Sequence, residues 1–217
     1  MLPLALNPPP GEPLRILCLG AHSDDIEIGA GGALLTLLER HPGARVRWVV
    51  FSAPGERAQE ARAAAAAFLA GAGEQRVDLH EFRDGLFPDE TTGLKAAFEA
   101  LKRDGAPDLI FTHTREDHHQ DHRTVAEMTA NTFRDHLVLG YEIPKYDPDF
   151  GNPNLFINLS PAHAEAKVAA LMEHFATQRS KRWFRPETFR GLMHLRGVQS
   201  ASPTGLAEGF YARKLCL

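Results

Sequence analysis

Two clusters of ionisable residues carry the chemistry that this sequence suggests. The first is His22-Ser23-Asp24-Asp25-Ile26-Glu27, and the second, residues 113–122, is HTREDHHQDH. Imidazole and carboxylate groups together are typical ligands of a catalytic zinc ion, which takes three protein ligands and keeps a position open for water. Such an ion lowers the pKa of its water from 15.7 to roughly 7, so hydroxide becomes available at neutral pH. The residue types therefore point to metal-assisted hydrolysis.

The spacing within each cluster supports this interpretation. The adjacent carboxylates of Asp24 and Asp25 repel each other, so we expect a positive charge nearby. Neighbouring side chains diverge in extended or turn backbone, so one carboxylate can face a metal while the other faces substrate or water. A helix starting near residue 120 would place His119 and His122 on roughly one face. His118 is four residues from His122, and the sequence leaves open whether His118 or His119 reaches the metal.

Each cluster alone has an ordinary explanation, because a His-Asp pair at the end of a strand is most often a helix cap with a solvated imidazole. Their positions in the predicted fold bring them together. Apolar runs at 14–20 and 107–112 predict two buried strands, and each is followed directly by one of the clusters. Ligands of parallel sheets bind beyond the carboxyl ends of the strands, so we expect both clusters at one edge.

The rest of the first two thirds alternates between strands and helices. Further strands are predicted at 46–51 and 76–80, and helices at 33–38, 60–71, 94–103 and 122–133. This alternation predicts an α/β fold, a Rossmann-like, mostly parallel sheet with helices on both faces and right-handed crossovers. Glycines 29, 31 and 32 lack the spacing of a dinucleotide fingerprint, which favours close packing over phosphate binding.

The last third is less regular. It predicts a loop at 144–154, a strand at 155–159, a helix at 161–175 and a closing strand at 210–215. Aromatic and charged residues there are candidates for substrate contacts, although such aromatic residues more often pack half-buried. These candidates are Tyr141, Glu142, Lys145, Trp183 and Phe184.

Composition limits the remaining classes of function. The 217 residues fit one domain, expected over 14–217, after a flexible Pro-rich leader at 1–13. A formal charge of -4 disfavours nucleic acid as the main partner. Two cysteines, Cys18 and Cys216, favour a reducing cytoplasm without a disulfide framework. The N-terminus lacks a basic signal-peptide region and the Ala-rich run at 63–73 is too short to span a bilayer, so no membrane insertion is expected.

The two ionisable clusters together resemble the motifs of a known family. His22-Ser23-Asp24-Asp25 with Glu27 and Gly31-Gly32, followed by His119-Gln120-Asp121-His122, resembles the LmbE/PIG-L family of zinc-dependent N-deacetylases over about residues 14–133. The family includes deacetylases of the mycothiol and bacillithiol pathways and of glycosylphosphatidylinositol assembly. Many members have Pro at the positions of Ser23 and Gln120 and have Glu directly after the paired aspartates. Here Ile26 precedes Glu27, which is similar to the bacillithiol-type branch and leaves the pathway open.

The resemblance implies a role for each matching residue. Zinc, or another divalent transition metal, would be bound by His22, Asp25 and His122, and Asp24 would act as general base on the metal-bound water. His119 would stabilise the oxyanion or protonate the leaving amine, Asp121 would orient an imidazole, and Arg57 would contact the substrate.

The resemblance also implies a reaction. It implies hydrolysis of the N-acetyl group of an N-acetylglucosamine-type amino sugar or sugar conjugate, releasing acetate and a free amine. The partner would be this small molecule, and a homo-oligomer is an open expectation. The alternative is a protein of the same fold that binds a sugar conjugate without turnover. The presence of Asp24 argues against that alternative. Its charge repels that of Asp25, and a protein that only binds its ligand has no need of this second carboxylate.

Overall fold

A seven-stranded sheet forms the centre of the protein. The computed structural model describes residues 4–215. The strands are β1 (Arg15–His22), β2 (Arg45–Ser52), β3 (Glu74–Leu79), β4 (Leu109–His113), β5 (Leu137–Tyr141), β6 (Leu155–Asn158) and β7 (Ala207–Ala212). Their order in space is β3-β2-β1-β4-β5-β7-β6. The first five are parallel, and β7 is antiparallel to both β5 and β6.

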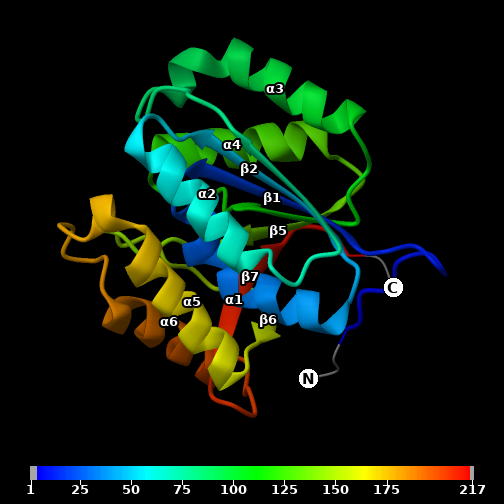
Figure 1. Cartoon of the computed structure of the whole chain (residues 1–217), viewed down its shortest axis with the longest axis vertical. Coiled ribbons are helices and arrows are strands. Elements are labelled where there is room, and N and C mark those ends of the chain that lie inside the picture. The colour runs from blue at the N-terminus through cyan, green and yellow to red at the C-terminus, as the bar shows by residue number, and fades with distance from the viewer. Residues whose placement is uncertain (1–3, 216–217) are drawn as a thin grey trace.

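Helices cover both faces of this sheet (Figure 1). On one face lie α1 (Asp25–Arg40), α2 (Glu56–Phe68), α5 (Pro161–His174) and α6 (Pro186–Gln199), packed on side chains such as Trp48 and Phe111. On the other face lie α3 (Thr91–Arg103) and α4 (Gln120–Thr132), packed on side chains such as Leu19 and Phe51. Two short 3-10 helices, η1 (Phe87–Glu90) and η2 (Ala176–Gln178), complete the set. The predicted single-domain α/β fold is therefore confirmed.

The chain reverses its direction of winding at β1. From β1 it runs outward through β2 to β3, and it then crosses back to β4 on the other side of β1. In sheets of this kind the loops after the two strands at the reversal diverge and leave a crevice at their carboxyl ends. The two ionisable clusters follow β1 and β4, so they occupy this crevice.

Four elements differ from the sequence-based expectation. Helix α1 begins at Asp25 rather than near residue 33, so the glycines at 29, 31 and 32 lie inside the helix. Strand β5 and helix α6 were not predicted, and the closing strand lies at Ala207–Ala212 instead of 210–215. Helix α6 buries Arg196 and Gly197 beside Phe189 and Met193 and leaves Leu195 and Val198 exposed, so its apolar pattern is weak.

Two glycines of α1 let the helix lie close to its neighbours. A Cβ built on Gly29 would lie 2.1 Å from the Tyr141 ring, and one on Gly31 would lie 2.6 Å from Phe68. Since Tyr141 is fully buried, its ring has little room to move aside. The glycines of α1 thus serve close packing, as the sequence suggested.

This packing leads to a matched pair of predictions. Gly29→Ala is expected to destabilise the protein by about 1–3 kcal/mol or more, because the added methyl overlaps a buried ring. Gly191→Ala, in the exposed part of α6 with nothing within 4 Å of the new Cβ, is expected to stabilise by up to about 1 kcal/mol through helix propensity. Urea unfolding followed by circular dichroism measures both. Equal effects of the two substitutions would contradict the packing role of Gly29.

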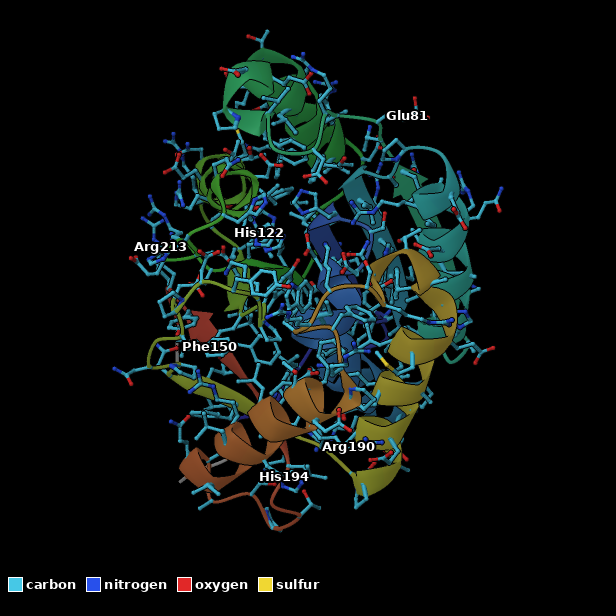
Figure 2. All side chains as sticks on the ribbon, turned by 90° about the vertical axis from the view of Figure 1, so that its left-hand side faces the viewer. Glu81, His122, Phe150, Arg190, His194 and Arg213 are labelled. Atoms are coloured by element: carbon cyan, nitrogen blue, oxygen red, sulfur yellow. The ribbon has the colours of Figure 1, made fainter. Side chains whose placement is uncertain are left out.

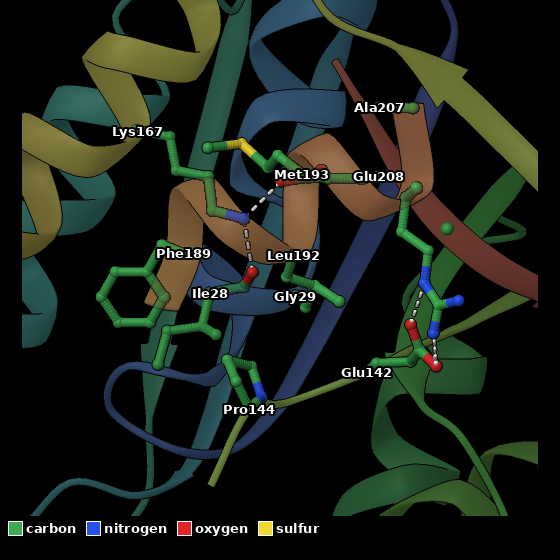
Figure 3. A pocket seen from close by; sticks show the side chains of 12 residues that line it. Ile28, Gly29, Glu142, Pro144, Lys167, Phe189, Leu192, Met193, Ala207 and Glu208 are labelled. Carbon is green, nitrogen blue, oxygen red and sulfur yellow. Dashed lines mark hydrogen bonds and ion pairs between the residues drawn. The ribbon is translucent and has the colours of Figure 1, made fainter. Parts of the chain in front are cut away.

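A buried ion pair also fixes α1. Nζ of Lys167 in α5 donates to the carbonyl of Ile28 and contacts Oε1 of Glu208 at 2.5 Å (Figure 3). The Glu208 carboxylate in turn accepts the backbone N–H groups of Gly32 and Ala33. These contacts tie the helix that carries the first cluster to α5 and β7, and so hold that cluster at a set distance from the sheet.

The first residues that the structure describes contribute little to the core. Residues 4–13 contain no helix or strand, although Leu6 packs against the main core cluster. The flexible leader at 1–13 stays a prediction. Cys18 is buried with a free thiol, and Cys216 lies outside the described residues. Among the helices of residues 4–215, none is both long and apolar enough to cross a membrane.

Candidate metal centre

The two ionisable clusters meet at the carboxyl ends of β1 and β4. His22 is the last residue of β1, and Asp24 and Asp25 stand at the start of α1. His119 caps the N-terminus of α4, and His122 lies in its first turn. His122 is only 3% exposed and lies toward the middle of the view in Figure 2. Residues about a hundred positions apart thus face one another in a cluster of polar side chains.

Three of these residues have the spacing of metal ligands. Nδ1 of His22 lies 3.2 Å from Nε2 of His122, and the Asp25 carboxylate lies 3.5 Å from each of these nitrogens. Two ligands of a tetrahedral zinc ion at about 2.0–2.1 Å are about 3.3 Å apart. The separations therefore fit a single small divalent ion, and His22, Asp25 and His122 form one of the groups of ligand atoms close enough to hold one.

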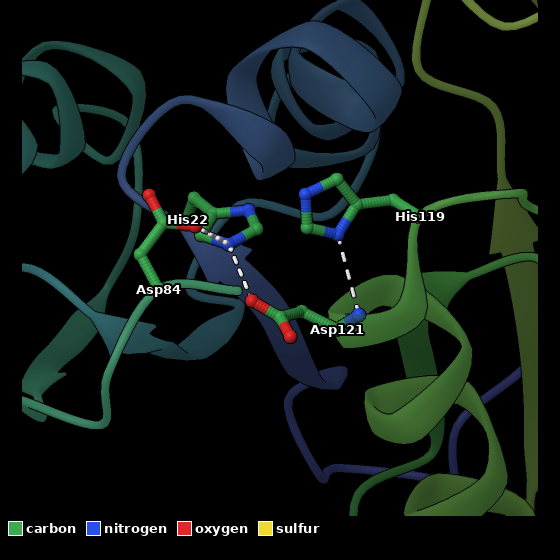
Figure 4. Close-up of side chains that lie close together, drawn as sticks. All are labelled: His22, Asp84, His119 and Asp121. Carbon is green, nitrogen blue, oxygen red and sulfur yellow. Dashed lines mark hydrogen bonds and ion pairs between the residues drawn. The ribbon is translucent and has the colours of Figure 1, made fainter. Parts of the chain in front are cut away.

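Carboxylates bind the far nitrogens of both imidazoles. Nε2 of His22 lies 3.1 Å from Oδ2 of Asp121 and 3.1 Å from Oδ1 of Asp84 (Figure 4). Nδ1 of His122 lies 2.9 Å from Oδ2 of Asp117. A carboxylate at the outer nitrogen holds the hydrogen there and leaves the inner nitrogen free to bind a metal. Burial, with the positive field of His113, lowers the pKa of His122 to about 4, so this ring is neutral at pH 7.

The neighbouring aspartates point in different directions, as their positions in sequence suggested. Oδ2 of Asp25 accepts the backbone N–H of His22 at 2.6 Å and faces the imidazoles. Burial alone would raise the pKa of Asp25, but its close contacts with the imidazoles of His122, His113 and His22 bring it well below its usual range. Burial, together with the negative charge of Asp25, raises the pKa of Asp24. One carboxylate is therefore a fixed anion, whereas the other has a proton affinity nearer to neutral pH.

His119 has a defined tautomer. Its Nδ1 accepts the backbone N–H of Asp121 at 3.2 Å, so in the neutral ring the hydrogen is on Nε2. Burial and the charge of His22 lower the pKa of His119, and the positive end of α4 acts in the same direction. Its ring lies 5.0 Å from that of His22 and 4.5 Å from that of His122, centre to centre. A neutral N–H donor therefore stands at the edge of the cluster.

Arg57 forms the opposite edge, at the start of α2. Its guanidinium donates to Oδ1 of Asp24 at 3.3 Å and to Oδ2 of Asp84 at 3.2 Å. The Asp84 side chain is 51% exposed, whereas those of Asp24 and Arg57 are 6% and 18% exposed. The cluster is therefore open to solvent on the side of Asp84.

All seven residues singled out from the sequence lie in or beside this cluster. They are His22, Asp24, Asp25, Arg57, His119, Asp121 and His122. Of the two neighbouring histidines, His118 is exposed and its backbone N–H donates to Asp149. His119 is the one that faces His22.

Sequence reasoning missed three residues that touch the cluster: Asp84, His113 and Asp117. Asp117 and His113 stand within the second cluster, where the sequence suggests no role for them, while Asp84 lies in a loop after β3 that carries no motif.

Most of the candidates for substrate contacts in the last third of the chain make structural contacts within the protein. Tyr141 and Phe184 are buried in the core, Glu142 pairs with Arg196 at 2.6 Å, and Lys145 lies 3.1 Å from Asp117. Trp183 packs against the core cluster.

Comparison with known sequences gives a family and a relative. Residues 17–133 match the family model PIG-L, described as GlcNAc-PI de-N-acetylase. The uncharacterized deacetylase YaiS of Escherichia coli K12 is 28% identical over 172 residues, which cover 73% of this chain and 89% of YaiS.

Solved structures share the fold at lower identity. N,N'-diacetylchitobiose deacetylase from Pyrococcus horikoshii superposes with a TM-score of 0.67 at 19% identity, covering 96% of this chain and 87% of that one. GalB, the 4-carboxy-2-hydroxymuconate hydratase from Pseudomonas putida KT2440, superposes with a TM-score of 0.72 at 19% identity, covering 94% and 98%. One fold thus serves a deacetylase and a hydratase, so the reaction must be argued from the residues of the site.

Proposed function

The chain belongs to the PIG-L family, and we propose that it is a zinc-dependent deacetylase that hydrolyses the N-acetyl group of an N-acetylglucosamine-type sugar or sugar conjugate. The observation that carries this proposal is the convergence of His22, Asp25 and His122 at ligand spacing, with Asp24 beside them. The names of YaiS and of the Pyrococcus horikoshii enzyme support deacetylation as the reaction.

The metal would be held by His22, Asp25 and His122. When bound, such an ion lowers the pKa of water and polarises a carbonyl oxygen. Asp121, with two backbone N–H donors at 2.6 and 3.1 Å from Gly85 and Phe87, is fixed in place and orients His22. Asp117 holds His122 in the same way, and Lys145 in turn contacts Asp117.

Asp24 would move the proton. Its raised pKa brings its carboxylate closer to the proton affinity that an efficient general base needs at neutral pH. It takes one proton from the attacking water while a C–O bond forms at the amide carbon. When the C–N bond breaks, the same proton passes to the departing nitrogen, so acetic acid and a free amine leave and Asp24 is again an anion. At neutral pH the acetic acid then loses its proton to solvent and becomes acetate. Arg57 keeps the carboxylate oriented through Oδ1.

His119 would stabilise the negative charge that develops on the amide oxygen. Its neutral ring can donate from Nε2, because Nδ1 is occupied as an acceptor at the N-terminus of α4. The resemblance implies two roles for His119, and this geometry favours stabilisation of the oxyanion over protonation of the amine. Arg57 and the exposed Asp84 offer a donor and an acceptor at the open side, where sugar hydroxyls can be bound.

An acetate-release assay tests the proposal. Purified protein is stripped of metal, reconstituted with zinc and incubated with N-acetylglucosamine and its O-glycosides. We expect acetate and an equal amount of free amine from the zinc form and only background from the stripped form. A protein that binds sugar without turnover would shift its melting temperature with these ligands but release no acetate. That result, or equal release from both forms, would overturn the proposal.

A single substitution at His119 separates its role from that of the metal ligands. His119→Ala is expected to lower kcat by about 10²- to 10³-fold with little change in zinc content, because one oxyanion donor is lost. Steady-state kinetics and elemental analysis measure the two effects. Loss of zinc in step with activity would instead make His119 a ligand.

Several finer expectations stay predictions. They are the cytoplasmic location, a homo-oligomer, and membership of the bacillithiol or mycothiol pathway.

A further inference from the structure

His113 is a buried histidine that the proposed reaction does not use. It is the last residue of β4, and its side chain is fully shielded from solvent. Its Nε2 lies 3.1 Å from Oδ2 of Asp25, 3.0 Å from the backbone nitrogen of Ala21 and 3.3 Å from the hydroxyl of Tyr141. One ring nitrogen therefore contacts the end of β1, the end of β5 and the carboxylate at the start of α1.

The same ring also supports a second ligand. It stacks on His122 with the ring centres 3.9 Å apart and an angle of 19° between the planes. Tyr141 fixes the other side, because its ring lies 4.8 Å away and its hydroxyl donates to the carbonyl of Leu19 at 2.6 Å. Packed between these neighbours, His113 has little freedom to rotate.

The contact with Asp25 determines how that carboxylate is turned. Oδ2 is occupied by the backbone N–H of His22 and by Nε2 of His113, while Oδ1 lies 3.5 Å from Nε2 of His122. Nε2 of His113 lies 3.1 Å from Oδ2 and also accepts the backbone N–H of Ala21 at 3.0 Å, so the ring is held between the Asp25 carboxylate and the end of β1. Without this partner the carboxylate could rotate away from the position that matches His122.

We infer that His113 is a positioning residue of the metal centre, which sets its affinity for a divalent ion by fixing the Asp25 carboxylate and the His122 ring. It does not bind the ion itself. The inference rests on the proposed function insofar as His22, Asp25 and His122 hold the ion. Residues that support ligands in this way typically contribute about 10- to 100-fold to metal affinity.

Three substitutions at this position separate support of the ligands from simple packing. His113→Leu fills the space without polar atoms. His113→Gln brings an amide to about the place of Nε2, where it can accept from Ala21 and donate to Asp25. His113→Asn carries the same amide on a shorter side chain that does not reach Asp25. His136→Leu, at a half-buried histidine that follows α4, is the matched control.

The measurement is the zinc dissociation constant, obtained by competition with a chromophoric chelator, with circular dichroism as the check of folding. We expect His113→Leu and His113→Asn to bind zinc at least fivefold more weakly than the unmodified protein, and His113→Gln and His136→Leu to stay within fivefold. Binding within fivefold by folded His113→Asn, or equally weak binding by the Gln and Asn variants, would overturn the inference. Should His113→Leu not fold, the Gln and Asn variants decide alone.

The same titration separates this inference from the proposed function. If the unmodified protein binds no zinc, the proposed metal centre fails. If it binds zinc and the variants at position 113 bind equally well, only the role of His113 fails.

Discussion

Asp24→Asn will lower kcat for acetate release by about 10²- to 10⁴-fold while the protein still binds one zinc ion. The amide has nearly the shape of the carboxylate and keeps an oxygen for Arg57, 3.3 Å away, but it cannot accept a proton from water. The predicted ligands His22, Asp25 and His122 are unchanged, so the ion should remain. Steady-state kinetics with elemental analysis of the same sample measures both quantities.

The control for this substitution is Asp147→Asn, at an exposed position in the loop that follows β5. We expect it to leave both kcat and zinc content unchanged. Full turnover by Asp24→Asn would show that another group takes the proton. Parallel loss of zinc and activity would show that Asp24 is itself a ligand.

His122→Ala is expected to remove both zinc and activity. Its Nε2 is 3.2 Å from Nδ1 of His22 and 3.5 Å from Oδ1 of Asp25, so the substitution removes one of the three proposed ligand atoms. Mutation of a residue that only supports a ligand typically lowers metal affinity by up to about 100-fold. Loss of a ligand itself should lower the affinity for zinc by more than this. The kcat should fall to the level of the metal-stripped protein.

His118→Ala is the matched control, because His118 lies in the same segment but is exposed, and its backbone N–H donates to Asp149. We expect wild-type zinc content and wild-type kcat. If His118→Ala loses zinc while His122→Ala keeps it, the ligand set is wrong.

The fold could be predicted wherever burial leaves a simple pattern in the sequence. Strands β1, β2 and β4 are buried on both faces and therefore appear as continuous apolar runs, each near its predicted place. Helix α1 begins earlier than the sequence predicts, because Gly29, Gly31 and Gly32 are typical of a loop. They are tolerated in the helix because neighbouring side chains, among them Tyr141, Phe68 and Leu159, occupy the space of the missing Cβ atoms, a tertiary effect that local propensity does not contain.

The part of the site that could be predicted consists of residues that lie close together in the sequence. His22 and Asp25, and likewise His119 and His122, are close in sequence, so their spacing is visible before folding. Asp84 comes from a loop after β3, and only the tertiary fold brings it within 3.1 Å of His22. Asp117 and His113 were visible as part of a polar run, but their roles depend on which ring nitrogen each one faces.

The buried charges explain why this region carries function rather than stability. Asp24, Asp25 and Glu27 are buried within one turn of α1, and both carboxylate oxygens of Glu27 lack a hydrogen-bond partner among the described residues. Burial, with the charges of Asp24 and Asp25, raises the pKa of Glu27 well above its usual range. Such a concentration of carboxyl groups costs folding free energy unless a cation is bound beside it.

The most direct test of the metal centre is an anomalous difference map from crystals of the zinc-loaded protein, recorded on both sides of the zinc absorption edge. The account predicts one strong peak within about 2.0–2.2 Å of Nδ1 of His22, Nε2 of His122 and the Asp25 carboxylate. A peak bound by other residues, or none between these three side chains, would contradict it.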